Sequence, residues 1–266
     1  MTVKNARTPL PTPLSAAEIR ERYAAAVRER SLFSARTTSA RYLQKLSELL
    51  KLVEAGELNE SDARLALQVV LNSLGYDPAT GFPGDDVPAA DEGGLTDLAS
   101  DARLRLVLRT NQSIDANLRR KAAAAADPAR LAAYPGWRFV RKGWVNPKRQ
   151  RNWETRWANA WRQVGGEGAA GQEMVALKSS PIWDALGNGA GGYRDSTGSS
   201  VPPFAYNSQM SWLEADRATC VRLGLLKEDD DVTIDFAPSL GEEEISRALD
   251  GLGDDFAGEL LKALAS

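Results

Sequence analysis

Basic and aromatic side chains are concentrated between Tyr134 and Arg162, a combination that binds anions. This segment holds five of the seven tryptophans, and it has eight basic residues against one acidic residue. Its local net charge is therefore +7, in a chain whose total net charge is −3. Such a concentration of positive charge needs an anionic partner, inside the chain or outside it. The segment predicts binding to phosphate or to an acidic protein surface.

The side chains expected to contact this partner are the basic residues that alternate with the aromatic ones. They are Arg138, Arg141, Lys142, Lys148, Arg149, Arg151 and Arg156. Trp153, Trp157 and Trp161 recur every four residues and therefore share one face of a helix. Two interpretations are open: the three indoles form a core stripe with the basic residues beside it, or they stack on nucleic-acid bases.

The composition excludes several kinds of catalytic site. The chain has no histidine, which removes Ser-His-Asp and Cys-His arrangements and histidine-ligated zinc. Its one cysteine, Cys220, cannot form an internal disulfide and is expected to be a small buried hydrophobe. Three adjacent aspartates, at 229–231, lack the spaced glutamate of a calcium loop and are typical of a solvated run. We therefore expect no catalytic residue, no metal and no cofactor.

Hydropathy gives two further expectations. No apolar run approaches the length of a membrane span, and the first residues have no apolar region typical of a secretory signal. A glycine-rich stretch at 187–200 contains neither a dinucleotide-binding nor a phosphate-loop pattern. We expect no membrane partner and no small-molecule substrate, and a reducing cytoplasm is the simplest site of synthesis.

Three short elements must position the basic segment. Trp137 and Phe139 alternate with arginine, which predicts a strand over 137–141 with one apolar face. Gly143, Asn146 and Pro147 predict a turn. Asn152 is placed to cap the helix that carries the tryptophan stripe.

The rest of the chain predicts an α+β fold, helical first and mixed later. We expect an extended arm at 1–14, disordered or lying on a partner, a helical subdomain at 15–76, and a loop or linker at 77–94. An α+β core at 95–226 and an acidic segment at 227–266, with net charge −9, follow. Within the helical subdomain, a capping box at 15–18 predicts a helix to residue 30, and helices over 38–55 and 59–75 form a hairpin. Further strands are expected at 173–178 and 231–236, and a capping box at 211–214 predicts a helix.

The order of five sequence blocks resembles the phage head-morphogenesis proteins, in particular the phage Mu F-like minor head proteins. The blocks are GLTDLASDARLRLVLRTNQSIDAN (94–117), YPGWRFVR (134–141), NWETRW (152–157), MVALKSSPIWDAL (174–186) and PPFAYNSQM (202–210). The resemblance covers roughly residues 30–226. In that family, a Thr-Asn helix precedes an α+β portion that ends in a proline-rich block, and Thr110-Asn111 and Pro202-Pro203 stand in those places.

This resemblance implies a non-enzymatic virion protein, made in the bacterial cytoplasm and associated with the portal, other head proteins, the capsid interior or packaged DNA. It implies membership of a multi-subunit particle. Two alternatives remain open from the residues. The basic segment also fits a nucleic-acid-binding protein, and the abundant arginine and acid leave room for an enzyme that works through carboxylates or arginine.

Overall fold

The computed structural model describes residues 7–23, 25–85, 87–143 and 151–234. These residues form two compact units, which we call the helical unit (residues 7–112) and the mixed unit (residues 113–234). The division falls between Gln112 and Ser113, inside the continuous helix α5 (Asp101–Ala126). The expected α+β class is confirmed, with helices before a small antiparallel sheet.

The stretch at 77–94, expected to be a loop or linker, contains no helix or named strand among its described residues. That stretch belongs to the helical unit, where the Asp85 carboxylate accepts hydrogen bonds from Thr38 Oγ1, at 2.7 and 2.8 Å, and from Phe82 N, at 3.1 Å. Proline and glycine predict turns, but they do not show which neighbours a turn will contact.

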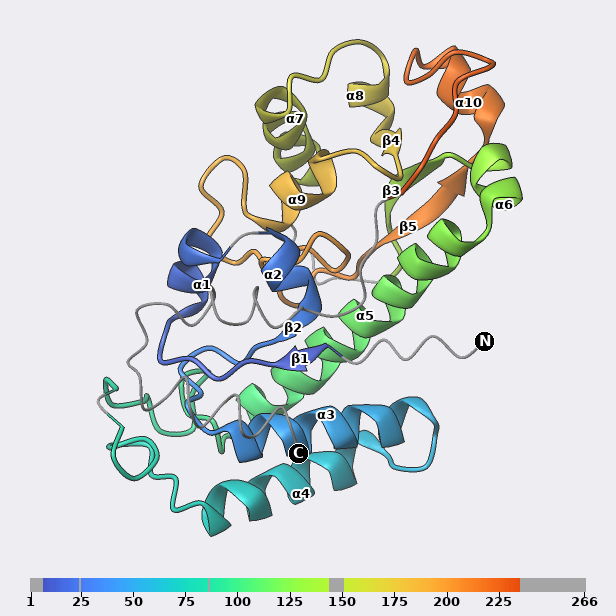
Figure 1. The fold of residues 1–266 in the computed structure, drawn as a ribbon. Coiled ribbons are helices and arrows are strands. Elements are labelled where there is room, and N and C mark those ends of the chain that lie inside the picture. The colour runs from blue at the N-terminus through green and yellow to red at the C-terminus, as the bar shows by residue number, and fades with distance from the viewer. Residues whose placement is uncertain (1–6, 24, 86, 144–150, 235–266) are drawn as a thin grey trace. The chain divides into compact units, whose positions relative to one another are not determined.

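The helical unit contains β1 (Thr8–Pro9), α1 (Ala16–Arg22), α2 (Ala25–Arg30), β2 (Ser31–Leu32), α3 (Ala40–Glu54), α4 (Glu60–Ser73) and the start of α5. The expected hairpin is α3 and α4, which lie side by side in Figure 1. Their N-caps are Ser39 and Asn59, and the capping box at Ser15 and Glu18 is present. Leucines on the inner faces of α3, α4 and α5 form the core.

Two expectations for the start of the chain need correction. The helix expected over 15–30 is two helices, because the chain is extended at Tyr23, where the Arg28 guanidinium binds the Tyr23 carbonyl oxygen. Residues 7–14 of the expected arm lie against their own unit: Leu10 N donates to Leu32 O at 3.0 Å and Thr12 N to Thr37 O at 2.7 Å. Leu10 and Thr12 are both fully buried. Residues 1–6 lie outside the described part of the chain.

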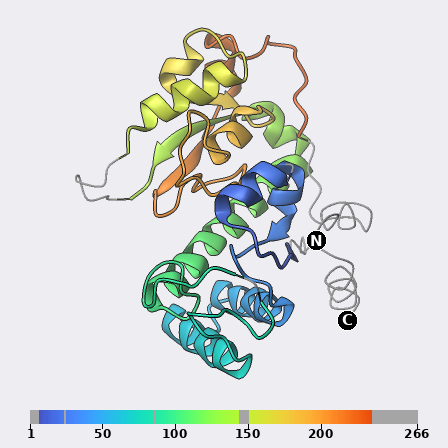
Figure 2. The ribbon, with the colours of Figure 1, turned by 90° about the vertical axis from the view of Figure 1, so that its left-hand side faces the viewer.

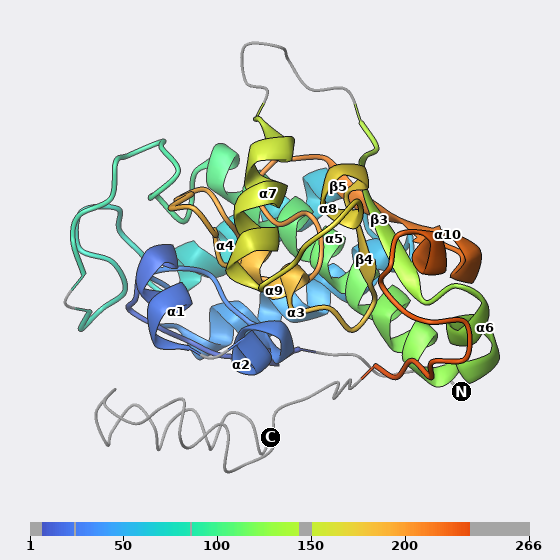
Figure 3. The same ribbon diagram turned by 90° about the horizontal axis from the view of Figure 1, so that it is seen from above.

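The mixed unit contains α6 (Pro128–Ala133), β3 (Gly136–Arg141), α7 (Trp153–Gln163), α8 (Ala170–Glu173), β4 (Val175–Leu177), α9 (Ile182–Gly187), β5 (Met210–Ala215) and α10 (Arg217–Arg222). Its sheet has the antiparallel order β4-β3-β5, with β3 in the centre (Figure 2). Trp137 and Phe139 point into one core, together with Trp212 of β5, and α7 lies beside α9 on this core (Figure 3). The strand predicted at 137–141 and the helix capped by Asn152 are both confirmed.

Two predictions for the later elements are wrong. Residues 211–214 do not open a helix, because they lie in β5 and pair with β3 along its whole length. The following helix, α10, is capped instead by Asp216, whose Oδ1 accepts from Thr219 N at 2.8 Å. Residues 231–234 of the strand expected at 231–236 are not in a strand, and residues 235–266 lie outside the described residues.

Close packing behind β3 explains the role of Cys220. A Cβ atom on Gly136 would lie 2.6 Å from Cys220 Sγ, so only glycine allows the helix α10 to approach the strand this closely. Burial, with a smaller effect from Asp216, raises the pKa of the Cys220 thiol to about 11. Cys220 is therefore a protonated, fully buried thiol at neutral pH, as expected for a packed hydrophobe.

Candidate functional site: the basic edge of the mixed unit

The tryptophan stripe belongs to the core, so the first of the two interpretations is confirmed. Trp157 is fully buried, Trp153 is 5% exposed, and Trp161 packs against the same cluster. Phe139 stacks on Trp157 with 5.7 Å between ring centroids and meets Trp153 edge-on at 5.2 Å. Trp157 therefore has no free face on which a base could stack, Trp153 is nearly enclosed, and Trp161 is partly buried.

Arg151 and Arg156 are held by an internal carboxylate. Arg151 Nε lies 2.5 Å from Asp195 Oδ2, and Arg156 Nη2 lies 2.8 Å from Asp195 Oδ1. The Arg156 guanidinium also lies over the rings of Trp153, at 4.9 Å, and Tyr193, at 4.0 Å. Burial raises the pKa of the Asp195 carboxyl, but hydrogen bonds from both arginines outweigh it and hold the pKa below its usual value. We call Asp195, Arg151 and Arg156 the Asp195 clamp.

Arg138 also has a partner on its own unit. Its Nη2 lies 3.3 Å from Glu173 Oε2, and Arg222 binds the same carboxylate at 2.8 and 3.1 Å. The hydrogen bond from Arg222, followed by that from Arg138, lowers the pKa of Glu173 despite some burial. Three of the seven expected contact residues, Arg138, Arg151 and Arg156, are therefore paired inside the mixed unit.

Arg141 and Lys142 differ from these three. They end β3 and begin the connection toward α7, and Lys142 is exposed. Arg141 Nε is buried and has no hydrogen-bond partner among the described residues. No acidic side chain pairs with either cation in the described part of the chain. We call Arg141 and Lys142 the basic edge; Lys148 and Arg149, also expected to bind, lie outside the described residues.

A cavity of about 200 Å³ opens beside this edge. It is lined by Phe139, Val140, Arg141, Arg151, Trp153, Glu154, Met174 and Met210. Met174 forms the left-handed C-cap of α8, and its carbonyl oxygen accepts from Phe139 N at 2.8 Å, which fixes this wall to β3. No sequence pattern predicted this cavity, because Met174 and Met210 lie in separate blocks that meet only through the sheet.

A buried cation lies elsewhere in the mixed unit. Lys178 Nζ, which has no exposed surface, lies 3.1 Å from Glu214 Oε1, and Arg130 binds the same carboxylate at 2.8 Å. Burial lowers the pKa of the Lys178 ammonium group, although Glu214 opposes this effect. Since Lys178 is enclosed, it can stabilise the fold but cannot reach a partner.

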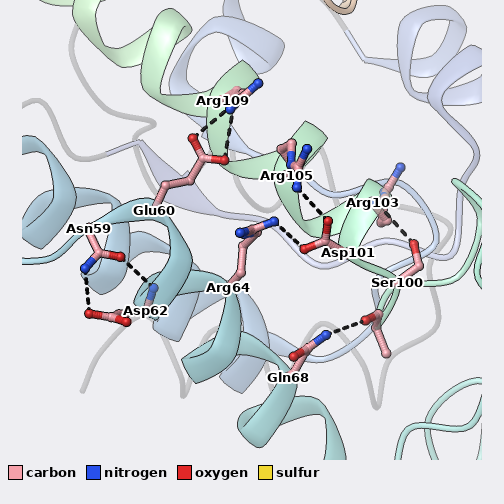
Figure 4. Close-up of polar contacts among 11 residues, drawn as sticks. Asn59, Glu60, Asp62, Arg64, Gln68, Ser100, Asp101, Arg103, Arg105 and Arg109 are labelled. Atoms are coloured by element: carbon pink, nitrogen blue, oxygen red, sulfur yellow. Dashed lines mark hydrogen bonds and ion pairs between the residues drawn. The ribbon is translucent and has the colours of Figure 1, made fainter.

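The helical unit carries a second arginine-rich surface, shown in Figure 4. Arg109 Nε lies 3.0 Å from Glu60 Oε2, Arg105 Nη2 lies 2.8 Å from Asp101 Oδ2, and Arg64 binds the other oxygen of Asp101. We call these five residues the α4–α5 seam. Each arginine of the seam has a carboxylate partner, so their charge joins two helices of one unit.

The described residues contain neither a candidate metal site nor a candidate membrane span. Within residues 7–234, apart from the gaps, no three His, Cys, Asp or Glu side chains are grouped so that they could hold a metal ion. None of the helices in the described ranges combines the length and apolar character needed to cross a membrane. The described arrangement supplies noncovalent contacts: two cations at an edge and a cavity next to them.

Comparisons with protein-family models, with curated proteins and with solved structures give no match to this chain. Function is therefore inferred from the residues and their geometry.

Proposed function

We propose that this chain is a non-enzymatic structural component of a phage or prophage head, recruited through its basic edge to an acidic surface of the portal or another head protein. The order of the five sequence blocks supports the phage assignment. Production in the bacterial cytoplasm and a final place in the head or portal region of the virion belong to the same proposal.

The observation that carries the docking site is the different use of charge along one segment. Arg138, Arg151 and Arg156 have carboxylate partners in the mixed unit, whereas Arg141 and Lys142 have none among the described residues. A pair of cations at the end of a rigid central strand can steer an acidic partner and fix its register. Exposed ion pairs contribute little to folding stability, so such cations are better explained by binding.

The test is to produce the tagged chain together with the portal and head proteins of its own phage and to purify the assembled particles. We expect the chain to sediment with the particles and to be released by high salt, since an exposed electrostatic contact is screened by ions. Imaging of the particles should place the chain at the head or portal. A chain that stays at the top of the gradient at low salt would contradict the proposal.

DNA is the alternative anionic partner, and the same preparation separates the two. Binding to empty particles, which contain no DNA, supports a protein partner. Retention on duplex DNA that falls steeply with salt, together with no binding to empty particles, would support a nucleic-acid-binding protein instead.

A further inference from the structure

We propose that the cavity beside Arg141 binds one aromatic side chain from an acidic segment of a partner protein, and that Arg141 pairs with a carboxylate of the same segment. This inference rests on the proposed function and makes it more specific, because it names the chemistry of the partner's anchoring residue.

The size of the cavity suits a single ring. Its volume is about 200 Å³, and a protein cavity of roughly 150 Å³ is already large enough to hold benzene. One aromatic side chain would therefore fill it, with some room left for the neighbouring backbone. The cavity lies wholly in the mixed unit, so its size does not depend on the other unit.

The apolar wall is preformed and suited to aromatic contact. Phe139 and Trp153 are 1% and 5% exposed and hold each other edge-on, so the ring positions are fixed before any ligand arrives. Met174 and Met210 complete the wall. Thioethers are polarisable and make favourable contacts with aromatic rings, and their flexible chains adapt to the shape of the group they receive.

The charged residues of the cavity wall, Arg141 and Arg151, determine how a ligand is oriented. Arg151, on one side, already uses its Nε for Asp195 and its Nη2 for the Tyr206 carbonyl oxygen. Arg141 instead has a buried Nε without a partner among the described residues. A buried donor without an acceptor costs free energy, which a carboxylate from the ligand would recover. The first turn of α7, which contributes Trp153 and Glu154, adds the positive end of the helix dipole.

Glu154 sets a limit on the ligand. Its exposed carboxylate stands in the wall of the same cavity and repels a nearby negative charge. The ligand must therefore place its carboxylate on the Arg141 side. We therefore take a peptide as the ligand, and binding of nucleic acid is an outcome that the experiment below distinguishes.

The methionines provide a direct measurement. The chain has three, Met1, Met174 and Met210, and two of them line the cavity. The intact chain, labelled with ¹³C at the methionine methyl groups, is titrated with acetyl-Asp-Asp-Phe-Asp-Asp-amide while methyl NMR spectra are recorded. We expect the Met174 and Met210 signals to shift in a saturable manner, half complete at or below about 1 mM, and Met1 to stay in place.

Two control peptides and three variants test whether binding needs the aromatic ring, the acidic residues and Arg141. Replacing phenylalanine by alanine, or the aspartates by lysine, should abolish the shifts. Arg141→Gln should weaken binding at least about tenfold, because a hydrogen-bonded charge is lost. Glu154→Gln should strengthen it a few-fold, and Arg162→Gln, an exposed arginine of α7 outside the cavity, should leave it unchanged.

The inference is overturned if the methyl signals do not shift at a peptide concentration of about 5 mM, five times the expected half-saturation value. It is also overturned if the alanine peptide causes equal shifts. Both measurements use the wild-type chain, so neither depends on how a variant folds. A single-stranded oligonucleotide that moves both methyl signals when the peptide does not would also overturn it. The two proposals can fail separately. Methyl shifts without particle binding would leave the cavity assigned and reject the head protein, and particle binding without methyl shifts would do the reverse.

Discussion

The α4–α5 seam and the β3–α7 region are both rich in arginine, but they use charge differently. In the seam, three arginines share Glu60 and Asp101 on the surface of two packed helices, where the Asp101 side chain is 59% exposed. In the β3–α7 region, the Arg156 side chain is only 10% exposed, and the aromatic core lies directly beneath it. The basic edge, in the same region, has no carboxylate partner among the described residues.

This difference shows that the burial of an arginine side chain, and not the number of charges around it, decides how much its ion pair contributes to stability. Exposed pairs such as those of the seam contribute about 0–1 kcal/mol each. A nearly buried cation such as Arg156 must keep its counter-charge, or the fold loses stability. A cation that has no carboxylate partner, such as the exposed Lys142 among the described residues, is available for binding.

The largest expected loss of stability comes from truncating the aromatic core beneath the β3–α7 region. Trp157→Ala should lower the free energy of unfolding by about 3–5 kcal/mol, because a fully buried indole leaves a cavity beside the rings of Phe139, Trp161 and Trp183. Leu65→Ala on α4, where the leucine is 60% exposed, should change it by less than about 0.5 kcal/mol. Urea unfolding of both variants measures the contrast, and similar losses would show that the stripe is not core.

The next effect compares Asp195 and Asp101, two carboxylates that each bind two arginines. Asp195→Ala should cost about 2–3 kcal/mol, because Arg156 is left nearly buried without a counter-charge. Asp101→Ala in the seam should cost less than about 1 kcal/mol. Adding Arg156→Met to Asp195→Ala should recover part of the loss. If both aspartate variants lose the same stability, the distinction by depth fails.

The Asp195 clamp also predicts a dependence on pH. The pKa of Asp195 is lower in the folded chain than the value near 3.9 expected when unfolded. Its contribution should therefore be complete above about pH 5 and should fall as the pH drops below about 4. The stability difference between the wild type and Asp195→Asn should shrink over that acidic range. A difference that grows on acidification would mean the pKa is raised instead.

The smallest expected effect on folding concerns the basic edge itself. Arg141→Glu combined with Lys142→Glu should change the free energy of unfolding by less than about 1 kcal/mol, since neither side chain has an ion-pair partner in the described ranges. Thermal unfolding followed by circular dichroism gives this value. A loss comparable to that of Asp195→Ala would mean that the edge serves the fold.

The local elements were predictable wherever a short pattern determines them. Asn152 caps its helix as expected, and the four-residue spacing of Trp153 and Trp157 placed both in the core. Pairing across the chain was not predictable. Asp195 is the single acid of the 187–200 loop, and nothing in its neighbourhood in sequence points to arginines 39 and 44 positions away.

Strand β5 shows a second limit. The residues at 211–214 have the spacing of a capping box, but they pair with β3 as a strand, and Trp212 is fully buried. Tertiary pairing therefore outweighed a local signal. The candidate site was found only in part: Arg141 and Lys142 were among the expected residues, whereas the cavity walls at Met174 and Met210 depend on the same pairing.

The most direct test of the central claim is the amount of chain carried by purified particles, measured for the Arg141→Glu, Lys142→Glu double variant. The matched control reverses two exposed lysines away from the basic edge, Lys51→Glu and Lys227→Glu, which changes the net charge by the same amount. We predict that the control is incorporated like the wild type, and that the basic-edge variant is folded but reduced at least about tenfold. Normal incorporation of the basic-edge variant would contradict the claim that this edge docks the chain.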